Sequence, residues 1–192
     1  MNIRLAEKND AVQVADIHQK EIKKGFLSTL NKKFLAKIYS AIIESEIGFC
    51  VVSEKDEKII GFISGVVNLD KFYFYFLRKY LFQVFFLLFP QIFNFRKIID
   101  IIFYPLKEKD LPKAELLAMV VESQFQGQGV AGQMFKKFVS EMKNKRIDSF
   151  KVFVGGNLLP AIKFYEKSGF KFIKNTKIHR NCISRVYIYQ IK

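Results

Sequence analysis

The sequence has few of the residues from which metal centres and disulfide scaffolds are built. It contains no tryptophan, two cysteines (Cys50 and Cys182) and two histidines (His18 and His179) among 192 residues. Two cysteines give no disulfide framework, and without a C-x-x-C pair the common zinc patterns are absent. We therefore expect no metal site.

Long apolar runs are also missing. The first eight residues carry none, which predicts no secretory signal and a cytoplasmic protein. In the phenylalanine-rich segment 72–104 the longest unbroken apolar stretch is only Val84 to Pro90, with Gln83 before it and Gln91 after it. Because a spanning helix needs about 20 predominantly apolar residues, this segment is too interrupted to cross a membrane.

Acidic residues are outnumbered by basic ones, 18 against 32, which gives a formal charge of +14. Such a balance favours anionic partners: nucleic acid, a membrane surface or a phosphorylated small molecule. The basic residues are scattered and no helix-turn-helix or RNA-binding motif accompanies them, so nucleic acid is not expected. The length and the 50% apolar content predict one folded domain over residues 1–192.

The hydrophobic periodicity predicts a mixed α/β domain. Between the third and fourth strands, the aromatic segment 69–112 is expected to form helices broken near Pro90. The predicted helices span 11–22, 31–44, 130–144 and 160–167, and the predicted strands span 3–5, 49–53, 58–67, 115–121, 150–154, 170–173 and 184–191.

A glycine-rich turn, Gln126-Gly127-Gln128-Gly129, joins the apolar strand 115–121 to the helix that begins at Val130. Free N–H groups at the start of a helix, together with its dipole, suit a pyrophosphate, and glycine lets the backbone approach it closely. The P-loop pattern is excluded because no Gly-Lys-Ser/Thr follows. The letters G-x-G-x-x-G do match, but a dinucleotide fingerprint follows the first strand of a βαβ unit, whereas this strand comes late.

A second motif begins about thirty residues after Gly127. Together the two motifs resemble those of the GNAT superfamily of N-acetyltransferases over residues 115–172. The first matches its Gln/Arg-x-x-Gly-x-Gly/Ala pattern and the second its N-x-x-A-x-x-F-Y-x-x-x-G-F pattern. Departures from the commonest pattern are Ser123 for proline, Gln126 for arginine and Ala131 for glycine, which the superfamily tolerates. The matching residues are Gln126, Gly129 and Ala131, then Asn157, Ala161, Phe164, Tyr165, Gly169 and Phe170.

The resemblance implies a mostly antiparallel central sheet that is splayed between its fourth and fifth strands and flanked by helices, with acyl-CoA in the gap. The backbone of Met119 and Val121 would run beside the pantetheine arm, and Asn157 and Phe164 would contact the cofactor. The pyrophosphate would be held by N–H groups of Gln126, Gly127, Gln128, Gly129, Val130 and Ala131.

The implied activity is transfer of acetyl from acetyl-CoA to a primary amine of a small molecule, such as an amino sugar, by direct attack in a ternary complex. CoA is the product. Tyr165 would protonate the leaving thiolate, since a phenol can donate without being ionised at neutral pH. Glu115 would act as the base through water, with Glu122 as the alternative. Both carboxylates are open to a second interpretation, as solvated charges at strand ends.

The aromatic segment leaves three alternatives open: a structural cap or homodimer interface, an acceptor wall, or an anionic-membrane contact with a long-chain acyl donor. In the second, the wall's phosphate contacts would be Arg78, Lys79, Arg96 or Lys97. The membrane contact is not favoured. The stretch from Gly25 to Leu30 is either an acceptor contact or a helix connector. The rival function is a basic nucleic-acid or partner-binding protein on a non-catalytic GNAT fold.

Overall fold

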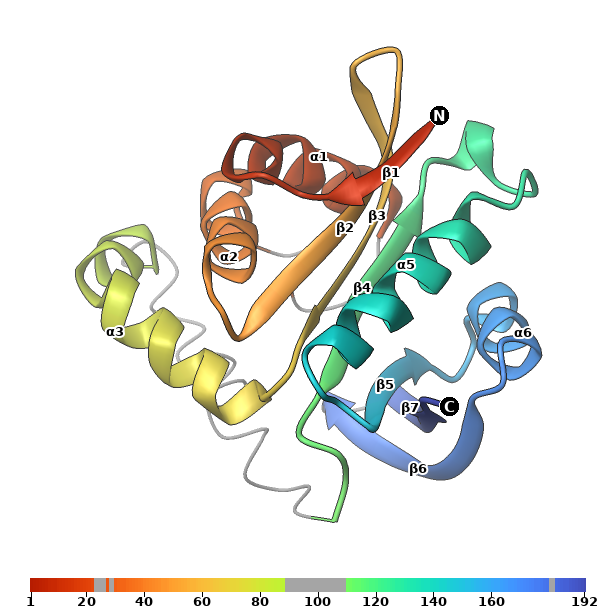
Figure 1. Cartoon of the computed structure of the whole chain (residues 1–192). Coiled ribbons are helices and arrows are strands. Elements are labelled where there is room, and N and C mark those ends of the chain that lie inside the picture. Colours follow the sequence, from red (N-terminus) through yellow and green to blue (C-terminus); the bar gives the residue numbers. More distant parts are fainter. Residues whose placement is uncertain (23–26, 28–29, 89–109, 180–181) are drawn as a thin grey trace.

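One sheet of seven strands, in the order β1-β2-β3-β4-β5-β7-β6, forms the centre of the molecule (Figure 1). The computed structural model describes residues 1–22, 27, 30–88, 110–179 and 182–192. Neighbouring strands run antiparallel except β4 and β5, which are parallel. The strands are β1 (Asn2–Leu5), β2 (Gly48–Lys55), β3 (Lys58–Val66), β4 (Glu115–Val121), β5 (Ser149–Gly155), β6 (Lys171–His179) and β7 (Cys182–Gln190).

Helices cover both faces of the sheet, which confirms the predicted mixed α/β fold (Figure 1). The residues with which they meet the sheet form two separate apolar clusters, a first core under α1, α2 and α3 and a second core under α5 and α6. The helices are α1 (Ala11–Glu21), α2 (Lys32–Glu44), α3 (Leu69–Leu88), α5 (Val130–Asn144) and α6 (Leu159–Lys167), with short 3-10 helices η1 (Lys8–Asp10) and η5 (Ser123–Phe125).

Local sequence signals explain where these helices begin. The side chain of Asn31 accepts the N–H of Phe34 at 2.8 Å and caps α2, while Pro160 occupies the first turn of α6. In α5, apolar residues at helical spacing all face the sheet, and burying each contributes about 1.5–3 kcal/mol. These residues are Met134, Phe135, Phe138 and Met142.

The predicted splay lies between β4 and β5. These strands share two residue pairs, Glu115 with Lys151 and Leu116 with Val152, whereas β3 follows β4 as far as Val121. The register between β3 and β4 also shifts, because Ser64 pairs with Ala118 and Gly65 with Leu116. The bulge therefore lies in β4, where the two parallel strands separate.

The described part of the aromatic segment is α3, which packs on α2 and acts as a structural cap. Phe76 makes an edge contact with Phe34, with ring centroids 6.0 Å apart, and Phe72 and Tyr80 are buried beside it. The ammonium of Lys79, one of the four phosphate contacts that the acceptor-wall alternative offered, pairs with the Glu44 carboxylate at 2.8 Å.

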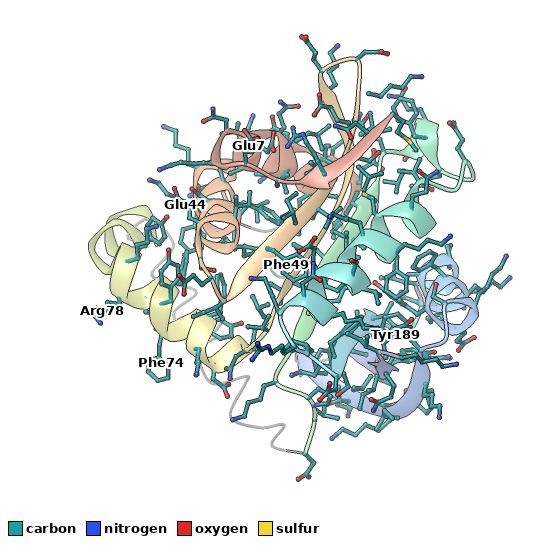
Figure 2. All side chains as sticks on the ribbon, in the orientation of Figure 1. Glu7, Glu44, Phe49, Phe74, Arg78 and Tyr189 are labelled. Carbon is teal, nitrogen blue, oxygen red and sulfur yellow. The ribbon has the colours of Figure 1, made fainter. Side chains whose placement is uncertain are left out.

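The outer face of α3 carries Phe74 and Arg78, which point away from the sheet (Figure 2). No helix in the part of the chain that the structure describes is long and apolar enough to cross a bilayer. Arg96, Lys97 and the expected break near Pro90 lie outside the described residues, as do residues 25–26 and 28–29 of the predicted acceptor stretch.

A buried histidine in α1 makes the first core sensitive to acid. His18 is 2% exposed, and its Nδ1 lies 2.6 Å from the hydroxyl of Tyr39. Its Nε2 has no hydrogen-bond partner among the described residues. Burial lowers the pKa of His18 to about 4 from the ordinary 6.5, so the ring is neutral at pH 7.

We predict that His18→Gln flattens the fall in stability on mild acidification. Between pH 6.5 and 4 the unfolded chain binds a proton at this histidine that the folded chain does not, so stability falls as the pH drops. The loss from pH 7 to pH 5 is about 2 kcal/mol. Urea unfolding of the wild-type protein and the variant at pH 7 and pH 5 isolates the contribution of His18, because all other groups titrate in both proteins. Equal falls in the two proteins would contradict it.

Candidate active site

The turn before α5 presents its backbone to open space. Gly127 and Gly129 have φ angles of 76° and 80°, in the left-handed region that glycine adopts without strain. A Cβ built on either residue, or on Gly132 in the first turn of α5, would meet no atom within 4 Å. Within the described chain, the N–H groups of Gly127, Gln128 and Gly129 donate to no backbone acceptor. Residues 127–132 therefore fit a pyrophosphate cradle.

Two glutamine side chains hold this turn in shape. The amide of Gln126 donates to the carbonyl of Val121 at 2.9 Å, and the amide of Gln128 donates to the carbonyl of Gln124 at 3.1 Å. The side chain of Gln126 thus ties the turn to the end of β4 and brings no charge to the cradle.

The edge of β4 beyond the splay carries unpaired backbone groups. The N–H of Glu122 donates to the carbonyl of Ile60 at 2.9 Å, so this residue is paired with the β3 side. Alternate residues of an antiparallel strand face opposite sides, and Val121 and Met119 therefore direct their N–H and C=O groups away from β3. The carbonyl of Val121 accepts the Gln126 amide, so the groups left for a further strand are the N–H of Val121 and the N–H and C=O of Met119. This edge can pair with an extended amide chain.

The aromatic residues of α6 close the other side of the site. Tyr165 is 5% exposed and lies edge-on to Phe164 and Phe170, with ring centroids 5.7 and 5.0 Å apart. Burial raises the pKa of its phenol above the ordinary value. The phenol is therefore neutral and available as a donor at pH 7. Asn157 is exposed in the turn after β5.

The second core brings together five of the ten predicted cofactor residues and Tyr165, the predicted acid. They come from β4, the start of α5 and α6, and their side chains pack in one cluster. The glycine turn adjoins this cluster through Val130. The residues in question are Met119, Val121, Val130, Ala131, Phe164 and Tyr165.

Glu115 lies apart from them, at the root of the splay and on the opposite face of the sheet. Its strand neighbour Leu116 belongs to the second core, while Val66, its partner on β3, belongs to the first. Glu115 is 7% exposed, so the interpretation as a solvated charge is wrong. Burial raises its pKa to about 7, and the ammonium of Lys151, 3.6 Å away, partly offsets that rise.

Glu122, the alternative base, is engaged in other contacts. It pairs with Lys20 of α1 at 2.9 Å and accepts the Gln124 amide at 3.2 Å, while Glu21 accepts the Ser123 hydroxyl at 2.6 Å. These contacts join the end of α1 to the turn after β4. Beside them lies an open cleft of about 490 Å³, lined by Lys20, Glu21, Ser123 and Gln124.

Two buried polar residues escaped the sequence analysis. In the sequence His18 figures only as one of two histidines, and Lys151 only as part of the predicted strand 150–154. The apolar, polar, apolar order of Phe150, Lys151 and Val152 is typical of a strand with one exposed face, and it predicts an exposed lysine. The structure shows instead that Lys151 is buried and paired with Glu115.

Comparison with known proteins identifies the fold. The Acetyltransferase (GNAT) family matches residues 13–170. No curated protein sequence matches the chain. Similar solved structures include Ard1 from Thermoplasma volcanium, with 16% identity over 100% of this chain and 97% of that chain and a TM-score of 0.66.

Two further structures show the same fold. YncA from Salmonella typhimurium, a putative acetyltransferase determined with its cofactor acetyl-CoA, has 14% identity over 100% of this chain and 94% of that chain, with a TM-score of 0.64. A ribosomal-protein-alanine N-acetyltransferase from Brucella melitensis has 11% identity over 99% of both chains, with a TM-score of 0.65. At these identities the likeness concerns the fold.

The open glycine turn generates a binding prediction. Gly129→Ala places a methyl group in the cradle and forces a left-handed residue, at a backbone cost of about 1–2 kcal/mol. We expect CoA to bind at least about ten-fold more weakly, the equivalent of one lost hydrogen bond. Calorimetric titration with CoA measures this loss.

Gly169→Ala is the matched control for that titration. Gly169 also has a positive φ, 94°, but it follows the C-terminal end of α6, so the variant carries the backbone cost without entering the turn. Equal CoA affinities of the Gly129 and Gly169 variants would show that the turn does not hold the cofactor.

Proposed function

The chain belongs to the Acetyltransferase (GNAT) family and is an N-acetyltransferase, and we propose that it transfers the acetyl group of acetyl-CoA to a primary amine of a small molecule. The observation that carries the proposal is the continuity of three parts: the open glycine turn, the unpaired edge of β4, and the buried phenol of Tyr165. Together they give a thioester cofactor a phosphate site, a strand to pair with, and an acid.

Cofactor binding follows from the backbone. The N–H groups from Gly127 to Ala131 would hold the pyrophosphate at the positive end of α5. The pantetheine amides would pair with the Met119 and Val121 edge, while Phe164 packs against the arm and Asn157 contacts it. The N–H of Val121 is then available to polarise the thioester carbonyl.

The chemical step needs one acid and one base. The amine attacks the thioester carbon, the C–N bond forms and the C–S bond breaks, and the leaving thiolate takes the phenol proton of Tyr165. Glu115 would take the proton that the amine loses. Glu115 precedes Met119 by four residues along β4, a distance on the order of 13 Å. Because this is too far for direct transfer, the proton would reach the carboxylate through water.

We place the acceptor on the α1 side of the sheet. The cleft lined by Lys20 and Glu21 opens at the end of α1, and Glu115 lies on the same face. The glycine turn leads into α5 on the opposite face. An amine approaching from the α1 side would therefore meet the thioester in the gap without displacing the cofactor. An amino sugar suits such an open polar cleft.

A protein N-terminus is the second candidate acceptor. It is favoured by the likeness of the fold to a ribosomal-protein-alanine N-acetyltransferase. CoA release in the presence of amino sugars, other small amines and peptides with free N-termini separates the two. Turnover with peptides alone would overturn the small-molecule proposal.

Titration with acetyl-CoA, CoA and a long-chain acyl-CoA tests the donor. We expect saturable one-to-one binding of acetyl-CoA. Tighter binding of the long-chain ester would indicate that the aromatic segment binds the acyl chain. Salt-sensitive nucleic-acid binding, without affinity for CoA, would favour the non-catalytic alternative.

We predict that Tyr165→Phe lowers kcat about 100-fold or more, because the thiolate then leaves without its acid. The affinity for CoA changes little, since the ring and its packing remain. Tyr189→Phe is the matched control, because it removes a hydroxyl from the same core. Undiminished kcat in the Tyr165 variant would remove this residue as the acid.

A further inference from the structure

A buried ion pair lies at the root of the splay. Glu115 and Lys151 face each other across the short parallel ladder, with Oε2 and Nζ 3.6 Å apart. Their side chains are 10% and 6% exposed. A charged pair so deeply buried is costly and rarely stabilises a fold more than apolar residues would, so its presence calls for a functional explanation.

The ammonium of Lys151 is fixed in place. Its Nζ donates to the carbonyl of Pro112 at 2.5 Å, and its backbone N–H donates to the carbonyl of Ala114 at 3.0 Å. The chain just before β4 thus anchors both ends of the lysine. Its charge cannot turn toward solvent without breaking these contacts.

The carboxylate of Glu115 is less completely satisfied. Its Oε2 has no hydrogen-bond partner among the described residues, and 3.6 Å is longer than a hydrogen bond. The lysine therefore supplies charge to the carboxylate without using its free lone pairs. A carboxylate in this state can still accept a proton.

Few other groups influence this carboxylate. On α3, burial raises the pKa of the Tyr73 phenol, and the nearby charge of Glu115 raises it further. From β3 the facing residue is Val66, which is uncharged. Of the groups identified around Glu115, only Lys151 carries a positive charge.

We propose that Lys151 is a positioning residue for acetyl transfer, whose fixed ammonium keeps the buried Glu115 ionised so that Glu115 can accept the proton of the acceptor amine. The inference rests on the proposed function. In each turnover the substrate ammonium loses two protons. One passes through water to the Glu115 carboxylate and then to solvent, and the other returns to the phenolate of Tyr165, which gave its own proton to the thiolate. Lys151 keeps its own proton throughout.

Removing the lysine should therefore change the pH dependence. Without the nearby cation, burial alone acts on Glu115, and the carboxyl stays protonated to higher pH. We expect the acid limb of kcat/KM in Lys151→Met to move upward by about 1–2 pH units, with activity partly regained at alkaline pH. A merely structural role would lower activity at every pH and leave the limb where it was.

The experiment is a set of pH profiles of kcat/KM, recorded with CoA affinity at each pH. Lys171→Met is the matched control, because Lys171 is exposed on the edge strand β6 and should leave the profile unchanged. Lys151→Arg keeps the charge and should keep the limb near its original position. An unchanged limb in Lys151→Met overturns the proposal.

A folding failure of Lys151→Met leaves Lys151→Arg to decide. A limb that moves upward although the charge is kept would contradict the proposal. Glu115→Gln separates this inference from the function on which it rests. Full activity and an unshifted limb in that variant would remove Glu115 as the base, while unchanged CoA binding would leave the cofactor site intact.

Discussion

The proposed site depends on the brevity of the pairing between β4 and β5. The two strands share two residue pairs and then separate, β4 staying with β3 and β5 staying with β7 along its whole length. A parallel ladder left incomplete exposes N–H and C=O groups that must find other partners. The edge beyond Leu116 is therefore both the weakest part of the sheet and the place where an extended cofactor can complete it.

The splay also divides the molecule into two chemical faces. On the α5 face, the glycine turn, Phe164 and Tyr165 are gathered around one apolar core, which suits phosphate and thioester binding. On the other face lie the cleft at the end of α1 and the buried pair of Glu115 and Lys151. The proposed acid and the proposed base thus belong to different faces, which meet at the gap between β4 and β5.

Buried polar groups concentrate on the α1 to α3 face. His18 with Tyr39, and Glu115 with Lys151, each carry an atom that lacks a hydrogen-bond partner in the described structure. Unsatisfied buried atoms cost about 1–3 kcal/mol each, so the first core is held by its apolar residues and by contacts such as that of Lys79 with Glu44. The α3 helix, with Phe72 and Phe76 inward, adds apolar area that offsets this cost.

The sequence alone determined the elements and the cofactor motif. Hydrophobic periodicity and capping signals such as Asn31 and Pro160 are local, so most helices and strands lie within a few residues of their predicted bounds. The exception is β6, which was predicted over 170–173 and runs from Lys171 to His179 because it pairs with β7 along its length. The spacing from Gln126 to Ala131 and from Asn157 to Phe170 identified the family. Only the tertiary structure decided the state of single side chains: that Glu115 is buried, that Lys151 faces it, and that Lys79 is already paired with Glu44. The alternation of apolar and polar residues along one strand does not show which helix covers the polar face of that strand. Burial and side-chain pairing arise between residues that are distant in the chain.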